Sequence, residues 1–331
     1  MTTLETPNSL PFNDPETTPK TALVTGASSG IGWYTTLHLY MHGWDVFLGV
    51  RNFPKGQKAI DDIKTEAEKR QRDGRVPASA KFGQLALVQM DLLDIESLNK
   101  VEDQLQKTPK LDLLVHNAGI MAVPRENSKD GWEVQLQTNY VAPFVLTDRL
   151  LPLLQKAPKP RIVYLSSIGH HFAMSPAPLD KVQDGFPGLY YGFVRYGYSK
   201  TAGMQLVNQL AKDYPQILSL SVHPGFVMET ELYRHWNSLP LVGPLFYLGF
   251  RGFGAVFGVK QEEGCYSTLV AALSPDLTAP QDSGEFLWTK GSKGTPSSVV
   301  KNEDYARENW NWTVDQMEQK GVRIRHFQYK R

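Results

Sequence analysis

A glycine-rich turn near the N-terminus constrains the fold of this chain more than any other feature. Residues 20–25 are a short, partly apolar run, and the spacing Gly-x-x-x-Gly-x-Gly follows at Gly26, Gly30 and Gly32. Apolar and aromatic residues then continue to residue 40, which is typical of a strand, a turn and a helix. Such glycines let the backbone approach a diphosphate, which the free N–H groups of the helix stabilise; a tight turn without a ligand is the alternative.

The same alternation of apolar runs and helical stretches continues along the chain. We expect further strands at residues 45–50, 85–90, 111–116, 161–165, 217–222 and 285–288. We expect helices at residues 54–72, 95–107, 130–154, 196–214, 262–273 and 302–319. This order predicts an α/β fold with a doubly wound, mostly parallel sheet in a single domain. The mid-helix Asn139 and the nearby Pro143 predict a kink or a local opening in the helix at 130–154.

Composition suggests where the domain begins and ends. Residues 1–19 are rich in Thr, Pro, Asn and Glu and lack the pattern of a signal peptide, so we expect a mobile tail there. The domain is expected over residues 20–290, with a C-terminal extension at 291–331. Residues 239–259 form an apolar, aromatic stretch with a single charge, Arg251. It predicts either an element that dips into a lipid or membrane surface or a lid over a hydrophobic substrate.

Charge and cysteine usage exclude several classes of function. The net charge of +1 over 331 residues provides no field to attract nucleic acid, and we expect no such partner. Cys265 is the only cysteine, which excludes internal disulfides and suits a reducing, intracellular compartment. The histidines form no zinc-binding pattern with cysteine, so no metal is expected. The sequence leaves open whether the chain forms an oligomer.

The residues at the ends of the second and third expected strands indicate which cofactor the chain would bind. In dinucleotide folds an acidic residue at the second strand end binds the adenosine ribose, whereas a nearby arginine accommodates a 2′-phosphate. Val50 and Arg51 stand there without a carboxylate, which favours NADP(H) over NAD(H), although a solvated surface arginine is the alternative. Asp91, after the third strand, either hydrogen-bonds the adenine edge or caps the next helix.

Tyr196 and Lys200 carry the strongest chemical signal. Their spacing of four residues places both side chains on one face of a helix. An ammonium close to a phenol favours the phenolate, so the tyrosine becomes able to exchange a proton with a carbonyl oxygen near neutral pH. A chance pair on a solvated helix face is the alternative.

Small and polar residues at other strand ends complete a candidate site. Asn117, Ala118 and Gly119 follow the fourth strand and let the chain pass close to a cofactor, or simply form a turn. Ser167 follows the fifth strand, where open α/β sheets bind ligands, although a helix cap would use the same residue. His170 could line a substrate pocket.

Taken together, these motifs resemble those of the short-chain dehydrogenase/reductases. They occur in that family's order over about residues 20–288, and His223-Pro224-Gly225 closes the sixth strand as in the family. Within it the chain resembles the retinol dehydrogenase-like branch, and most closely fungal oxidoreductases of lipid droplets linked to vacuole morphology. Residues 32–40, 135–140 and 165–171 carry that finer resemblance, which implies a lipid-droplet or cytoplasmic membrane-surface location.

The resemblance implies roles for individual residues. Tyr196 would be the general acid in reduction and the base in oxidation, Lys200 would lower its pKa and hold the nicotinamide ribose, and Ser167 would hydrogen-bond the substrate oxygen. Asn139 would hold a water that links Lys200 to solvent. The implied cofactor-binding residues are Gly26, Ser28, Ser29, Gly30, Ile31, Gly32, Arg51, Asp91, Asn117, Ala118, Gly119, Tyr196, Lys200, Pro224, Gly225, Val227 and Thr230, the last displaced by an extra residue.

The sequence therefore predicts an NADP(H)-dependent, Rossmann-like oxidoreductase. It would transfer a hydride between the nicotinamide and a carbonyl or alcohol group of a lipophilic substrate. A cofactor-binding scaffold at a lipid surface, without catalysis, is the alternative. A serine hydrolase built on Ser167, His170 and Asp180 is a weaker hypothesis, because Ser167 lacks the Gly-x-Ser-x-Gly elbow.

Overall fold

A parallel sheet forms the centre of the molecule. The computed structural model describes residues 6–185, 188, 191–227 and 258–330. Among these residues, a seven-stranded sheet has the order β3-β2-β1-β4-β5-β6-β9, and its neighbouring strands are parallel. The strands are β1 (Thr21–Thr25), β2 (Asp45–Val50), β3 (Leu85–Gln89), β4 (Leu113–His116), β5 (Arg161–Leu165), β6 (Leu218–Val222) and β9 (Phe286–Leu287). The order reverses between β1 and β4, which makes the sheet doubly wound, as predicted, and opens a crevice at their carboxyl ends.

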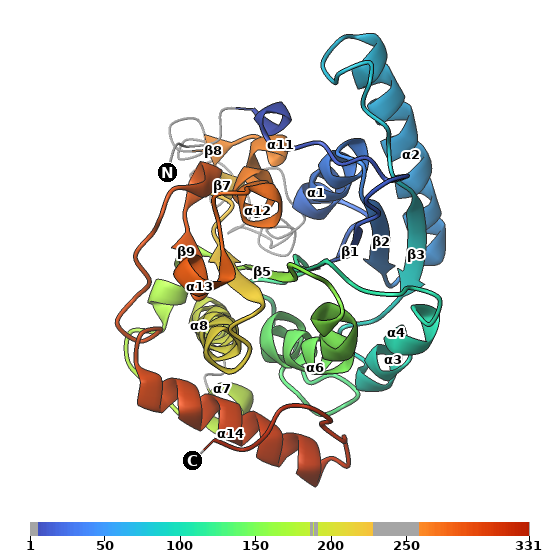
Figure 1. Cartoon of the computed structure of the whole chain (residues 1–331). Helices are drawn as coiled ribbons and strands as arrows, with labels where there is room; N and C mark the ends of the chain where they lie inside the picture. Colours follow the sequence, from blue (N-terminus) through green and yellow to red (C-terminus); the bar gives the residue numbers. More distant parts are fainter. Residues whose placement is uncertain (1–5, 186–187, 189–190, 228–257, 331) are drawn as a thin grey trace, which may run out of the picture.

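Helices cover both faces of this sheet (Figure 1). One face carries α1 (Gly30–Met41), α2 (Phe53–Arg72), α11 (Gln261–Gly264) and α12 (Tyr266–Leu273). The other carries α3 (Ile95–Asn99), α4 (Val101–Gln104), α6 (Ala142–Gln155) and α8 (Tyr191–Asp213), with α14 (Glu303–Gln319) packed outside α8. Shorter elements are η1 (Pro7–Ser9), α5 (Val134–Leu136), η2 (Gln137–Val141), η3 (Ile168–Phe172), α7 (Leu179–Asp184), α13 (Ala279–Asp282), η5 (Thr289–Gly291) and a small sheet of β7 (Phe226–Val227) with β8 (Gly258–Val259).

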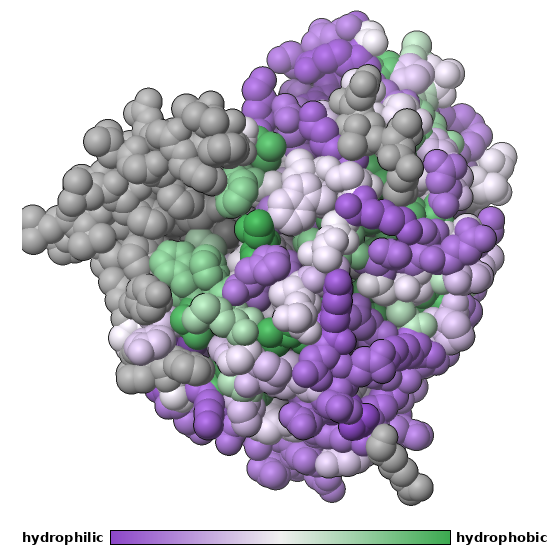
Figure 2. Space-filling view, turned by 90° about the vertical axis from the view of Figure 1, so that its left-hand side faces the viewer, coloured by the Kyte–Doolittle hydropathy of each residue, from purple (hydrophilic) through white to green (hydrophobic). Residues whose placement is uncertain are grey.

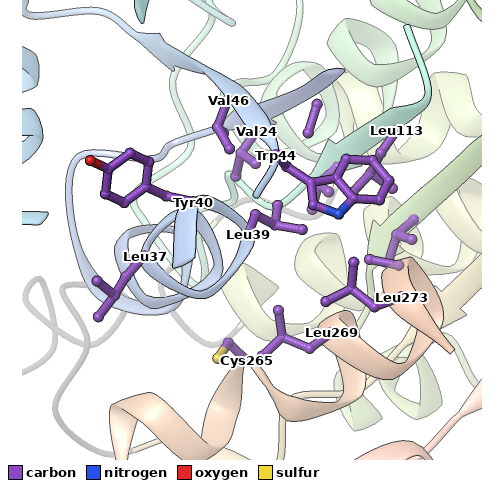
Figure 3. Packing of buried hydrophobic residues seen from close by; sticks show 14 of the residues in the cluster. Val24, Leu37, Leu39, Tyr40, Trp44, Val46, Leu113, Cys265, Leu269 and Leu273 are labelled. Atoms are coloured by element: carbon purple, nitrogen blue, oxygen red, sulfur yellow. The ribbon is translucent and has the colours of Figure 1, made fainter. Parts of the chain in front are cut away.

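Apolar side chains from the strands and from α1 and α12 fill the space between them. Figure 3 shows Val24, Val46 and Leu113 from three neighbouring strands, with Leu39 from α1 and Leu269 from α12 close by. All five are buried, with at most 1% of their surface exposed. Strands covered on both faces are nearly all apolar, which explains why the sequence predicted them well.

Two predicted helices are interrupted. The helix expected at 95–107 is two short helices, α3 and α4, separated at Lys100. The helix expected at 130–154 opens into a π-helical turn, η2, which contains Asn139 and lies just before Pro143. The predicted local opening is therefore confirmed, and π turns of this kind are frequent at functional sites.

The N-terminal segment packs against the domain instead of forming the mobile tail expected at 1–19. Pro7 and Leu10 are buried, and Phe12 stacks on the ring of His42 with a centroid separation of 4.2 Å. His42 Nε2 lies 3.1 Å from Pro7 O, and Asn13 Nδ2 donates to Gly43 O at 3.0 Å. The expectation was wrong for residues 6–13, because these contacts join the segment to the end of α1.

The C-terminal extension is anchored to α6 by one buried carboxylate. Asp148 accepts hydrogen bonds from the backbone N–H groups of Arg325 (3.0 Å), His326 (2.7 Å) and Phe327 (3.1 Å). The Phe327 ring then packs on Trp310 of α14, at a centroid distance of 4.8 Å. The extension is thus part of the packed structure.

Hydrophobic surface is concentrated on one part of the face shown in Figure 2. On the face shown in Figure 2, hydrophobic residues gather next to the grey atoms, and hydrophilic residues cover much of the rest. Most of the apolar stretch at 239–259 lies outside the described residues, so the choice between a lipid-binding element and a lid stays a prediction. Among the described helices, none combines the length and the hydropathy needed to cross a bilayer.

Candidate active site

The glycine turn forms a cradle between β1 and α1. Gly26 and Gly30 have φ values of +65° and +56°, which glycine adopts without strain. A Cβ on Gly32 would lie 2.4 Å from Gly26 O and 2.4 Å from Asn117 Nδ2, so a side chain cannot fit there. Asn117 also donates from Nδ2 to Thr25 O at 2.8 Å. The turn and the end of β4 are therefore locked together as one surface.

This cradle fits the diphosphate of a dinucleotide. Ser29 is the N-cap of α1, yet its side chain makes no capping hydrogen bond. The first N–H groups of α1 therefore have no side-chain cap, and a helix start of this kind binds phosphate through them and through its dipole. Gly26, Ser29, Gly30, Ile31 and Gly32 line the cavity described below.

Tyr196 and Lys200 lie together on α8. Both side chains are buried, at 2% and 4% exposure. Lys200 Nζ lies 5.8 Å from the centroid of the Tyr196 ring and donates a hydrogen bond to Leu165 O at 2.7 Å. Burial lowers the pKa of Lys200 from 10.5 to about 7, so its charge depends on pH in the physiological range. The predicted juxtaposition is confirmed.

Ser167 reaches the same place from the end of β5. It is the N-cap of the 3₁₀ helix η3, and its Oγ accepts a hydrogen bond from Gly169 N at 3.0 Å. A Cβ on Gly169 would lie only 2.5 Å from Cε1 of Tyr196. The turn therefore packs directly on the tyrosine ring, and the absence of a side chain at Gly169 makes that approach possible.

His170 ties this turn to the C-terminal extension. Its Nδ1 lies 2.6 Å from Ser167 O, and its Nε2 accepts from Ser297 N at 3.1 Å. The ring is therefore the neutral tautomer with its proton on Nδ1. Burial lowers the pKa of His170 to about 4, in agreement with a neutral ring. His170 therefore contributes to the site indirectly, by holding the backbone of Ser167 through this hydrogen bond.

Asn139 holds the π turn against the site. Its Oδ1 accepts from Ile120 N at 3.0 Å, and its Nδ2 donates to Ile120 O and to Ser199 Oγ, each at 2.9 Å. A Cβ on Gly119 would lie 3.1 Å from Asn139 Oδ1 and 3.2 Å from Lys200 Nζ, so both polar groups flank this glycine. The proposed water relay through Asn139 stays a prediction.

The side chains of Ser167, Tyr196 and Lys200 meet at one cavity of about 750 Å³, whereas Asn139 and His170 do not line it. Ser167, Tyr196 and Lys200 line it together with the glycine cradle, Asn117, Ala118, Gly119, Pro224, Gly225 and Val227. Apolar side chains also line it, namely Ile120, Met121, Val123, Ile168, Phe172, Phe193 and Phe226. The arrangement places a phenol, a hydroxyl and an ammonium beside a dinucleotide cradle in a largely apolar pocket.

Four predicted cofactor residues are not placed at this cavity. Ser28 and Arg51 do not line it, and Arg51 is exposed at the end of β2. Asp91 also stands apart and accepts a hydrogen bond from Leu93 N at 3.0 Å. Of its two alternative roles, the helix cap was wrong, because Asp94 caps α3 by accepting from Ser97 N, and the contact with the adenine edge stays a prediction. Thr230 lies outside the described residues.

A buried polar frame beside the site was missed by sequence reasoning. It consists of Glu133, Gln135 and Arg195, each with at most 1% of its surface exposed. Arg195 immediately precedes Tyr196, which was a usable signal, but its partner Glu133 is 62 residues away. Charge and spacing alone do not reveal a pair across such a separation.

Comparisons with known proteins agree with this geometry. A family model described as short chain dehydrogenase matches residues 20–177. The chain is 32% identical to short-chain dehydrogenase/reductase drtF of Aspergillus calidoustus, over 93% of this chain and 96% of that one. It is 30% identical to human retinol dehydrogenase 14, over 88% and 84% of the two chains. A fungal short-chain dehydrogenase/reductase and a retinol dehydrogenase are therefore both similar to it, and the lipid-droplet location stays a prediction.

Solved structures show the same fold. A protein from Mycobacterium paratuberculosis superposes with a TM-score of 0.67 at 24% identity, over 98% of this chain and 100% of that one. A Beutenbergia cavernae protein described as an NAD(P)-dependent gluconate 5-dehydrogenase, solved with NADP at low occupancy, has a TM-score of 0.59 at 23% identity, over 82% of this chain and 94% of that one. The fold, the site and the relatives lead to one conclusion. The chain belongs to the short-chain dehydrogenase/reductase family of oxidoreductases, which use a nicotinamide cofactor.

Proposed function

We propose that this protein transfers a hydride between NADP(H) and the carbonyl or alcohol carbon of a lipophilic substrate. The observation that carries the proposal is the meeting of Tyr196, Ser167 and Lys200 at one cavity that the glycine cradle also lines. The nicotinamide, when bound, supplies or accepts the hydride. The protein contributes orientation and proton transfer.

Tyr196 is the proposed general acid in reduction and general base in oxidation. The Lys200 ammonium, 5.8 Å from the ring, favours the phenolate and assists loss of the phenolic proton. Ser167 uses its Oγ as acceptor for Gly169 N, which leaves the hydroxyl hydrogen available for the substrate oxygen. The two hydroxyl groups then act on the same oxygen from adjacent elements.

The cofactor preference rests on Arg51. It stands at the end of β2, where a carboxylate would select the ribose of NAD(H) and an arginine accommodates the 2′-phosphate of NADP(H). Its side chain is exposed and accessible to a ligand. The lipophilic substrate is supported by the wall of the cavity, where Met121, Val123, Phe172 and Phe193 present apolar surface.

A substrate screen with a matched pair of variants tests the proposal. We expect the wild type to oxidise NADPH faster than NADH with aldehydes, with kcat/KM rising as the alkyl chain lengthens. Tyr196→Phe should abolish turnover while the NADPH Kd stays within about twofold, because the hydroxyl acts only in proton transfer. Tyr198→Phe is the control, since its hydroxyl donates to Ser175 O at 2.9 Å, away from the cavity.

The outcomes distinguish the enzyme from its alternative. Turnover in Tyr196→Phe equal to that of Tyr198→Phe would remove Tyr196 from the mechanism. NADPH binding without oxidation on any carbonyl would favour the cofactor-binding scaffold at a lipid surface instead. Binding to vesicles or to isolated lipid droplets tests that location directly.

A further inference from the structure

A buried ion pair adjoins Tyr196 and takes no part in the proposed proton transfer. Arg195 lies on α8, and Glu133 accepts from Leu136 N at 2.8 Å as the N-cap of α5. Both side chains are fully buried, and Arg195 Nε lies 3.2 Å from Glu133 Oε1. Removing two charges from water is costly, and well-packed apolar residues often serve stability equally well. Stability alone therefore does not explain why a charged pair occupies this buried position.

Hydrogen bonds connect this pair to the wall of the cavity. Arg195 Nη2 donates to Val123 O at 3.0 Å, and Val123 lines the cavity. Gln135 accepts from Ala122 N at 2.6 Å and donates to Gly192 O, in the first turn of α8, at 3.2 Å. The same frame thus holds residues 122–123 and the start of the helix that carries Tyr196.

The wall segment has an unfavourable backbone conformation. Ala122 has a φ of +51°, a region that residues with a Cβ rarely occupy. A Cβ on Gly192 would lie 3.1 Å from Ala122 Cα, so the two backbones are in close contact. Strain of this kind persists only where the surroundings hold it, and it is concentrated at functional sites.

We infer that Glu133 and Arg195 are positioning residues, which together with the adjoining Gln135 fix the cavity wall at residues 122–123 to the start of α8. Through these contacts they set the separation between the wall that receives the substrate and the Tyr196 hydroxyl. The kinetic consequence rests on the proposed function, whereas the effect on the wall segment does not. A test must therefore measure both.

Three variants separate positioning from simple loss of stability. Glu133→Gln and Arg195→Met each leave one buried partner without its counterpart, which is strongly destabilising. The double variant Glu133→Gln/Arg195→Met removes both charges, so we expect its melting temperature to return towards that of the wild type. Asp148→Asn is the control, because that buried carboxylate holds residues 325–327 and does not line the cavity.

The two readouts are amide exchange and steady-state kinetics. We expect the Ala122 amide to exchange at least tenfold faster in the double variant, and not in Asp148→Asn. With the best aldehyde found for the wild type, we expect kcat to fall tenfold to a hundredfold in the double variant while the NADPH Kd changes less than twofold. Asp148→Asn should lower the melting temperature and leave kcat unchanged.

Each outcome decides the proposal. Wild-type exchange at Ala122 in the folded double variant would overturn it, as would a wild-type kcat in that variant. Faster exchange with a reduced kcat would support it. If the wild type reduces no carbonyl, the proposed function fails on its own, and the exchange at Ala122 still decides whether the pair positions the wall.

Discussion

The strongest stability prediction concerns Glu262, which joins α11 to α1 and α2. Its Oε1 lies 2.9 Å from His38 Nε2 and 2.5 Å from Arg70 Nη1, and its Oε2 accepts from Arg70 Nη2 at 3.1 Å. Burial raises the pKa of this carboxyl group, but the hydrogen bonds from His38 and Arg70 outweigh that effect and lower the pKa to about 2. Burial keeps the pKa of His38 low, so Arg70 is the charged partner.

The size of the pKa shift of Glu262 sets its contribution to the stability of the fold. A fall from 4.5 to about 2 corresponds to about 3 kcal/mol of preference for the charged form. Because 30% of the Glu262 side chain is exposed, solvent screening reduces this contribution to about 2 kcal/mol. For a chain of 331 residues, the unfolding entropy is about 0.7 kcal/mol per degree, so Glu262→Gln should lower the melting temperature by about 3 °C.

The pH dependence follows from the sign of the shift. The folded-state pKa lies below the ordinary value, so the stabilisation is complete above about pH 4.5 and is lost as the pH falls through about 2. The difference between wild type and Glu262→Gln should therefore be constant between pH 8 and pH 5.5 and should narrow in more acidic solution. Urea unfolding at several pH values measures it.

The neighbouring glutamate is a matched control. Glu263 is 33% exposed and lies 4.0 Å from Lys290 Nζ, so Glu263→Gln should cost less than about 0.5 kcal/mol. Equal stability of the two variants would refute the reasoning, because it would mean that the contacts with Arg70 and His38 contribute nothing beyond an exposed charge.

Two further predictions concern the site. Gly169→Ala should lower kcat at least tenfold with an unchanged NADPH Kd, because the new Cβ would lie 2.5 Å from the Tyr196 ring. Steady-state kinetics with a cofactor titration measures both quantities, and a wild-type kcat would contradict the prediction. Lys200 has a folded-state pKa of about 7, below its ordinary value of 10.5. Between these two pH values the unfolded chain binds more protons than the folded chain, so the stability of the wild type should rise with pH relative to that of Lys200→Met. Urea unfolding from pH 6 to pH 9 measures this slope, and a constant difference would show that Lys200 titrates normally.

Much of the fold could be predicted because it depends on local patterns. The buried strands β2 and β5 match their expected bounds, since a short continuous apolar run bounded by turns is typical of a buried strand. The opening at Asn139 was also predictable, because its side chain competes with the helix and finds its partner at Ile120. Tyr196 and Lys200 could be found because their geometry is set within one helix.

What could not be predicted depends on contacts between distant residues. The N-terminal segment has the composition of a tail, yet Phe12 and Pro7 pack on His42, at the far end of α1. The buried pair of Glu133 and Arg195 likewise joins residues that are 62 positions apart in the chain. Propensity carries no information about such tertiary partners.

The two hydrogen bonds of the His170 ring make it a useful spectroscopic reporter. One ring nitrogen donates to the carbonyl of Ser167 and the other accepts from the amide of Ser297, which lies 127 residues further along the chain. The ¹⁵N chemical shifts of the two nitrogens should therefore differ strongly and report whether the serine turn is in place. This single ring offers a spectroscopic probe of the reaction centre that needs neither substrate nor turnover.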